Sequence, residues 1–125
     1  MKTILLVDDS KLLRMANARM LAKAGYEVLT AADGEEGLRL VQSRVPDVLV
    51  LDMMLPKISG VEVLRAVRSN PSTQALPVIV LTSLSQLNRD KIMAEGATDF
   101  VEKSQVSNQN SSDLLRAISR VLQRG

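Results

Sequence analysis

The chain has 125 residues, a formal net charge of +2, and neither cysteine nor histidine. The length fits one domain, 1–125, with a sizeable core. The missing residue types exclude disulfides, zinc–thiolate sites, thiol nucleophiles and histidine acid–base catalysis. The mild charge and only two aromatic residues argue against direct nucleic-acid binding. No apolar stretch approaches the ~20 residues of a membrane span, and the start shows no signal peptide, so we expect a cytoplasmic protein that does not contact a membrane.

Short apolar runs alternate along the chain with segments of helical spacing. The apolar runs predict five β-strands, at 3–7, 27–31, 48–51, 78–81 and 99–102. The first, third and fourth runs are almost continuously apolar, which is typical of strands buried on both faces of a parallel sheet. The second contains Glu27 and Thr30, and we predict that it lies at an edge.

The segments between these runs predict five helices. The first ends near 24, before Gly25, and the others run from the cap at 33 to about 43, then 61–69, 87–95 and 113–123. In the first helix, the spacing predicts one buried face made of Leu13, Ala16, Met20 and Leu21. Asp33 with Glu36 predicts a capping box, and the polar residues 104–111 predict a loop before the last helix.

Strands that alternate with helices predict a parallel sheet covered on both faces. Right-handed crossovers favour a doubly wound α/β fold, (βα)5, with five strands in the flavodoxin-like order 2-1-3-4-5. In that order the first and third strands are neighbours, and ligands bind outside the carboxyl ends of such strands.

Polar residues follow every predicted strand except the second. They are Asp8, Asp9, Asp52, Thr82 and Lys103. Taken singly, each has a commoner explanation as a helix cap, a strand end or a solvated surface charge. Together they would place three carboxylates, a hydroxyl and an ammonium at one edge, which suits Mg²⁺ or Mn²⁺ and a phosphoryl group.

The motifs at these positions are specific in their order and spacing. They are the segments 6–10, 51–56 with Gly60, 81–83 and 100–103. On these residues the whole chain resembles the receiver domains of bacterial two-component response regulators, and it is similar in size to the single-domain chemotaxis regulator.

The resemblance implies a role for each acidic residue. Asp52 would be the phosphoacceptor, which takes a phosphoryl group from a phosphohistidine on a sensor histidine kinase or a histidine phosphotransfer protein. Asp9 and Asp52 would ligate the metal together with the backbone carbonyl of Met54. Asp8 would hold a metal-bound water.

The resemblance also implies roles for residues around the acidic group. The Thr82 hydroxyl and the Lys103 ammonium would contact the phosphoryl oxygens. Phe100 would be the aromatic switch residue, which moves inward as Thr82 moves. Met54 and Leu84 occupy the two positions that tune loss of the phosphoryl group, and neither side chain can orient a water, so we expect slow autodephosphorylation.

As a response regulator receiver, the chain would switch protein–protein interactions as a monomer or weak dimer and would not be a turnover enzyme. The downstream protein target would bind the face formed by the segments 87–95, 99–102 and 113–123. Two alternatives stay open. The chain could be a pseudo-receiver that binds partners without phosphorylation, or a fragment of a longer regulator with an output domain.

Two local features bear on partners and switching. From Ser10 to Gly25 there are four basic residues and no acidic one, namely Lys11, Arg14, Arg19 and Lys23. This pattern predicts that the outer side of the first helix docks the phosphodonor. The family usually has proline after the lysine, whereas this chain has Ser104, which leaves the peptide geometry there undetermined.

Overall fold

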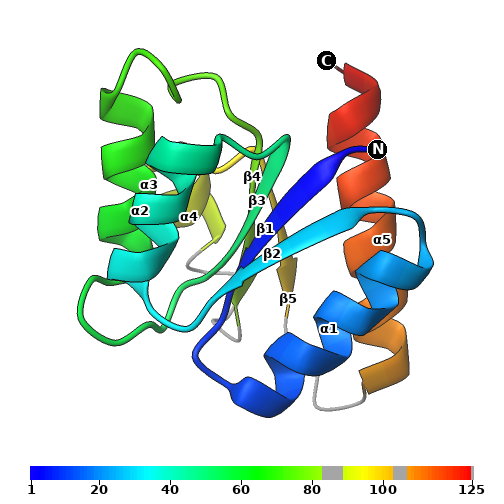
Figure 1. Ribbon diagram of the computed structural model, residues 1–125. Coiled ribbons are helices and arrows are strands. Elements are labelled where there is room, and N and C mark those ends of the chain that lie inside the picture. The colour runs from blue at the N-terminus through cyan, green and yellow to red at the C-terminus, as the bar shows by residue number, and fades with distance from the viewer. Residues whose placement is uncertain (83–88, 103–106, 125) are drawn as a thin grey trace.

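The computed structural model describes residues 1–82, 89–102 and 107–124. Five strands form one sheet: β1 Thr3–Val7, β2 Glu27–Ala31, β3 Val48–Asp52, β4 Val78–Thr82 and β5 Asp99–Glu102. Every neighbouring pair is parallel, and the strand order is β2-β1-β3-β4-β5 (Figure 1). The predicted fold class, strand positions and strand order are therefore confirmed.

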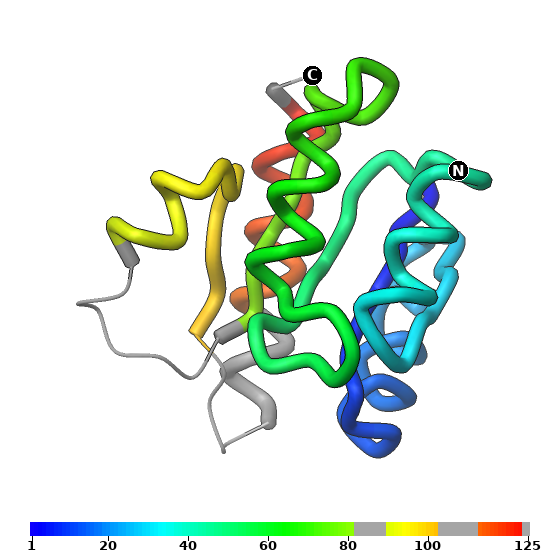
Figure 2. Tube along the Cα trace, turned by 90° about the vertical axis from the view of Figure 1, so that its left-hand side faces the viewer, coloured from blue at the N-terminus to red at the C-terminus, as the bar shows by residue number. Residues whose placement is uncertain are grey.

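In the described part of the chain, five helices cover the two faces of the sheet. They are α1 Lys11–Lys23, α2 Gly34–Arg44, α3 Gly60–Ser69, α4 Arg89–Ala94 and α5 Ser107–Arg124. α1 and α5 lie on one face, whereas α2, α3 and α4 lie on the other (Figures 1 and 2). No helix among the described residues is long and apolar enough to cross a membrane.

The alternating side chains of the central strands fill two separate cores. Ile4 and Leu6 pack on the α1–α5 side with Leu21 and Ile118. Leu5 and Val7 pack in the opposite core, together with the buried side chains of α2 and α3. All four of these strand residues are fully buried. The strand register that points their side chains into the two cores also determines which polar residues stand at the end of each strand.

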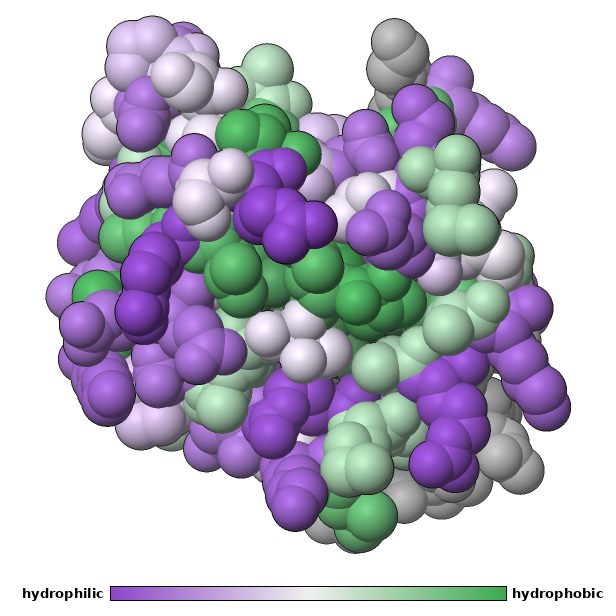
Figure 3. All heavy atoms as spheres, viewed as in Figure 1, coloured by the Kyte–Doolittle hydropathy of each residue, from purple (hydrophilic) through white to green (hydrophobic). Residues whose placement is uncertain are grey.

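β2 is the edge strand that the sequence predicts. Glu27 and Thr30 are exposed, whereas Val28 and Leu29 are half-buried. Figure 3, which views the molecule from the same side as Figure 1, shows apolar side chains across the middle of this side with hydrophilic ones above and below. The two termini lie near each other at the end of the molecule opposite the carboxyl ends of the strands (Figure 1).

Side-chain caps begin three of the helices. Ser10 caps α1 by accepting a hydrogen bond from the Leu13 N–H. Asp33 caps α2 by accepting from the Glu36 N–H at 2.8 Å, which is half of the predicted capping box. The reciprocal box is present at α3 instead, between Ser59 and Glu62. Gly25 has a φ of 101° and ends α1 in the left-handed region, as predicted.

The predicted buried face of α1 is wrong in part. Leu21 is buried and Met20 is half-buried, but Leu13 is 38% exposed and Ala16 is exposed. The second buried residue of α1, besides Leu21, is Asn17, which is only 8% exposed. α1 has apolar residues on two sides, so spacing alone could not decide which side is buried.

The predicted start of the last helix is also wrong. α5 begins at Ser107, several residues before the predicted start near 113. Ser and Asn have low helix propensity, and tertiary context often overrides this weak preference. The apolar residues of α5 follow helical spacing, and Leu114, Ile118 and Val121 are buried.

Candidate functional site

Three carboxylates meet at the carboxyl ends of β1 and β3. Asp52 is the last residue of β3, and Asp8 directly follows the neighbouring strand β1. One oxygen from each of Asp8, Asp9 and Asp52 lies within 4.8 Å of the others. Asp8 is fully buried and Asp52 is 4% exposed, whereas Asp9 is exposed. The predicted acidic site is therefore present, with one carboxylate facing solvent.

Local turns fix the direction of the two buried carboxylates. The Ser10 N–H donates to Asp8 Oδ1 at 3.0 Å, and the Met54 N–H donates to Asp52 Oδ1 at 3.2 Å. In both turns the aspartate accepts from the backbone two residues ahead, which is a common Asx arrangement. Each carboxylate is thus held by the turn that begins the loop after its own strand.

The loop that follows Asp52 is packed tightly between α2 and α3. A Cβ on Gly34 would lie 2.0 Å from the Ile58 carbonyl oxygen, and a Cβ on Gly60 would lie 2.6 Å from the Asp52 carbonyl oxygen. Only glycine allows such close approach of two backbones. Lys57 adds an ion pair of 3.6 Å to Asp33 at the start of α2. These contacts position the loop that carries Met54.

A basic side chain approaches the same site from α1. The Arg14 Nη1 donates to the Asp8 carbonyl oxygen at 2.8 Å. The sequence analysis placed Arg14 among the residues that dock a partner and did not foresee this contact. The only sequence signal was its position five residues after Asp9, which does not reveal that the side chain folds back to the strand end.

The acidic group fits a hard divalent cation. Three carboxylates at this separation repel one another, and a bound cation removes that repulsion. Oxygen-only ligands in small number are typical of Mg²⁺, which keeps several waters. Asp8, Asp9 and Asp52 are therefore the residues that could hold Mg²⁺ or Mn²⁺, and the backbone carbonyl of Met54 follows in the adjoining loop.

The other predicted site residues are placed less completely. Thr82 closes β4, where its backbone pairs in register with Glu102, while its side chain lies outside the described part of the structure. Lys103, Leu84 and Ser104 also lie outside the described residues. Phe100 is half-buried on β5 and packs against the core on the α2–α3 side. The Met54 side chain is 69% exposed.

Sequence relatives identify the family. A family model of the response regulator receiver domain matches residues 4–118. The transcriptional regulatory protein AfsQ1 of Streptomyces coelicolor is 41% identical over 82% of this chain. The match spans only 45% of that relative's length. Protein PilH of Pseudomonas aeruginosa is 34% identical, and the match covers 98% of this chain and 98% of that relative.

Solved structures of the same fold are similar over nearly the whole chain. The chemotaxis response regulator CheY4 of Vibrio cholerae superposes with a TM-score of 0.88 at 36% identity, covering 97% of this chain and 98% of that one. The receiver domain of sensor histidine kinase PA1611 of Pseudomonas aeruginosa superposes with a TM-score of 0.83 at 28% identity, covering 95% of each chain. In that structure a magnesium ion is coordinated in the active site cleft. With the family model spanning nearly all of its length, the chain belongs to the response regulator receiver domains of two-component signalling.

Proposed function

We propose that Asp52 accepts a phosphoryl group from a phosphohistidine donor in a reaction that needs Mg²⁺ or Mn²⁺. The observation that carries the proposal is the meeting of the Asp8, Asp9 and Asp52 oxygens within 4.8 Å at the ends of two central strands. Phosphoryl transfer depends mainly on positioning and charge neutralisation. A buried, oriented carboxylate beside two more acidic groups suits that chemistry.

In the proposed step, an Asp52 oxygen forms a bond to phosphorus as the bond from phosphorus to the donor's imidazole nitrogen breaks. The Met54 N–H holds the Asp52 carboxylate in one orientation. A divalent cation held by Asp9, Asp52 and the Met54 carbonyl, with Asp8 holding a coordinated water, would neutralise charge on the phosphoryl oxygens. The Thr82 hydroxyl and the Lys103 ammonium are assigned to the remaining phosphoryl oxygens by family resemblance.

The proposed donor is a sensor histidine kinase or a histidine phosphotransfer protein that approaches along α1. Lys11, Arg19 and Lys23 are exposed on this helix, whereas Arg14 is engaged with the Asp8 carbonyl. Complementary charge would mainly raise the association rate. Of the four basic residues, Arg14 would therefore support the site, and the other three would steer the donor.

The proposed output is a change in protein binding at the α4–β5–α5 face, with Thr82 and Phe100 as the switch. Phe100 is already packed partly against the core, so an inward movement would need only a modest repacking. We further propose that the chain acts in the cytoplasm and does not catalyse turnover of a separate substrate.

The test is to incubate the protein with acetyl phosphate and Mg²⁺ and to measure its intact mass. We expect a gain of one phosphoryl group that disappears when the metal is chelated and in Asp52→Asn. Asp90→Asn removes an exposed carboxylate on α4 and should leave labelling unchanged. Unlabelled wild-type protein would instead support a pseudo-receiver, and labelling of Asp52→Asn at the wild-type rate would refute the assignment.

The lifetime of the aspartyl phosphate offers a second test. We expect slow loss, because the exposed Met54 side chain and Leu84 cannot orient an attacking water. Misplacing a reactant by about 1 Å can cost on the order of a hundredfold in rate. Met54→Asn with Leu84→Glu should therefore shorten the lifetime. An unchanged or longer lifetime would show that other residues set the rate.

A further inference from the structure

Six residues of the chain contain sulfur, and all of them are methionines. Two neighbours among them differ sharply in exposure. Met53 is 5% exposed and packs in the core on the α2–α3 side, whereas Met54 is 69% exposed. Of the six, only Met1 at the amino terminus is more exposed. Because the chain has no cysteine, an oxidant that attacks sulfur can react only with these methionines.

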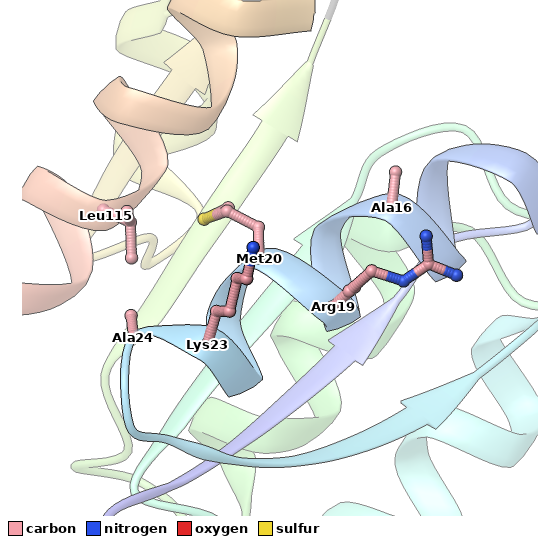
Figure 4. A pocket seen from close by; sticks show the side chains of 6 residues that line it. All are labelled: Ala16, Arg19, Met20, Lys23, Ala24 and Leu115. Carbon is pink, nitrogen blue, oxygen red and sulfur yellow. The ribbon is translucent and has the colours of Figure 1, made fainter.

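Two further methionines lie on α1 and serve as comparisons. Met15 is 50% exposed. Met20 is half-buried and extends from α1 toward α5, where Leu115 lies (Figure 4). The groove there has a volume of about 530 Å³ and is lined by Ala16, Arg19, Met20, Lys23, Ala24 and Leu115. Met20 lies 11 residues after Asp9, which corresponds to roughly 16 Å of helix rise, so its sulfur is remote from the acidic residues.

Met54, in contrast, adjoins the acidic residues. Its N–H donates to Asp52 Oδ1 at 3.2 Å. Leu51 and Met53 pack in the core on the α2–α3 side, so the alternation of side chains along the strand places Met54 on the side of Asp52. Single exposed apolar side chains are common, and exposure alone assigns no role. The position of Met54 next to the phosphoacceptor is what distinguishes it.

The thioether of Met54 contributes little to the chemistry of this site. Its sulfur is a weak hydrogen-bond acceptor and a soft ligand, whereas Mg²⁺ prefers oxygen. Oxidation to the sulfoxide makes the side chain polar, because the added oxygen accepts hydrogen bonds. One oxygen atom on Met54 would therefore bring an acceptor to a site that uses oxygen ligands and water.

We propose that Met54 is an oxidation site through which hydroperoxides regulate the acidic site. The inference rests on the proposed function, since the regulated steps are metal binding and loss of the phosphoryl group. The sulfur attacks one peroxide oxygen, and a bond from sulfur to oxygen forms as the bond between the two oxygens breaks. The proton of the attacked oxygen moves to the leaving oxygen, which departs as water or an alcohol. Sulfur loses two electrons and the peroxide gains them.

The added oxygen would act on the site in two ways. It would accept a hydrogen bond from a metal-bound water and so raise the affinity for the metal. It would also orient a water toward the phosphoryl group on Asp52 and so shorten the lifetime of the aspartyl phosphate. Damage to the fold would not produce this combination, because a disordered site would bind the metal more weakly.

The experiment treats the wild-type protein with hydrogen peroxide and locates the sulfoxides by peptide mass spectrometry. We expect Met54 to be oxidised before Met15 and well before Met53. Binding of Mn²⁺, followed by the electron paramagnetic resonance signal of the free ion, should then tighten about threefold, the effect of one added hydrogen bond. In protein labelled with acetyl phosphate, the lifetime should shorten on the order of tenfold. Methionine sulfoxide reductase with a dithiol should reverse both changes.

Three variants assign the response to one residue. Met54→Leu removes the sulfur, so peroxide should no longer change its affinity for Mn²⁺. Met15→Leu removes another exposed sulfur and should keep the full response of the wild type. Met54→Gln places an amide oxygen near the position of the sulfoxide oxygen and should bind Mn²⁺ more tightly without any peroxide.

Three results would overturn the proposal. They are oxidation of Met54 no faster than that of Met53, an affinity for Mn²⁺ that oxidation leaves unchanged or weakens, and a response of Met54→Leu equal to that of the wild type. All three are measured on protein that has not been phosphorylated, so they are distinct from a failure of Asp52 to accept a phosphoryl group. In protein that does become labelled, a lifetime that oxidation leaves unchanged would also overturn it.

Discussion

Within the two helix layers of this receiver, the helices are joined to one another in different ways. On one face, α3 and the end of α4 are joined by Arg65, whose Nε and Nη2 each donate to a Glu95 carboxylate oxygen at 2.7 Å. On the other face, the described residues include no ion pair between α1 and α5, and a groove separates them. The layer of α2, α3 and α4 packs against the loop that carries Met54, whereas the layer of α1 and α5 leaves surface available to partners.

Arg68 shows how closely the first layer is connected. Its guanidinium donates to the carbonyl oxygens of Gly96, Gln74 and Leu76, and to the Thr98 hydroxyl, at 2.6 to 3.2 Å. These four partners join the end of α3 to the segment before β4 and to the segment before β5. Burial lowers the pKa of Arg68, which is the expected effect of removing a cation from water among neutral acceptors.

The largest expected effect comes from adding one methyl group to the tightly packed layer. Gly34→Ala would place a Cβ 2.0 Å from the Ile58 carbonyl oxygen, so the backbone of α2 or of the loop must shift. We expect a loss of about 3 kcal/mol of unfolding free energy in urea. Ala16→Leu adds more volume at an exposed position of the open layer and should change stability by less than about 0.5 kcal/mol. Equal losses would remove the contrast between the layers.

The next effect comes from removing the Arg68 guanidinium. Arg68→Met keeps an apolar stem but leaves partly buried carbonyl groups without their donor, and we expect a loss of about 2 kcal/mol. Arg39→Met on exposed α2 is the matched control and should be nearly neutral. If the two variants have the same unfolding midpoint and slope, Arg68 does not join these segments energetically.

A gain in stability is expected from a substitution in α1, in the layer formed by α1 and α5. Asn17 is 8% exposed on the sheet-facing side of α1, and its side chain forms no hydrogen bond to the residues that the structure describes. Leucine at this position would replace a mostly buried polar side chain with apolar surface removed from water, so Asn17→Leu should raise the unfolding free energy by about 1 kcal/mol, measured by denaturant titration. A loss of stability would show that leucine does not fit or that the amide is bonded.

The smallest effect concerns pH. The hydrogen bonds from Arg65 lower the pKa of Glu95 below its ordinary value. A carboxyl group whose pKa is lower in the folded state stabilises the fold above its unfolded pKa, and this contribution is lost as the pH falls through the folded pKa. A double-mutant cycle of Arg65→Met and Glu95→Gln should show a small coupling at neutral pH that disappears on acidification. A coupling that is constant with pH would contradict this assignment.

The same contrast explains what the sequence could predict. Asp8, Asp9 and Asp52 could be placed together because strand order and strand ends follow from hydrophobic patterning and handedness. The contacts of Arg68 could not be predicted, because their partners lie up to 30 residues away and no periodic pattern connects them. The buried side of α1 was predicted only in part, because Asn17 is polar and the apolar residues Leu12 and Met15 face outward.

The position of the two termini has a practical consequence. Both lie at the end of the molecule opposite the acidic residues, and Met1 is 90% exposed (Figure 1). A dye, a purification tag or a surface anchor attached at residue 1 would therefore be held away from Asp9 and Asp52. Immobilising the protein through its amino terminus should leave the phosphorylation edge open to a donor in solution, which makes single-molecule or surface-based measurement of the transfer reaction feasible.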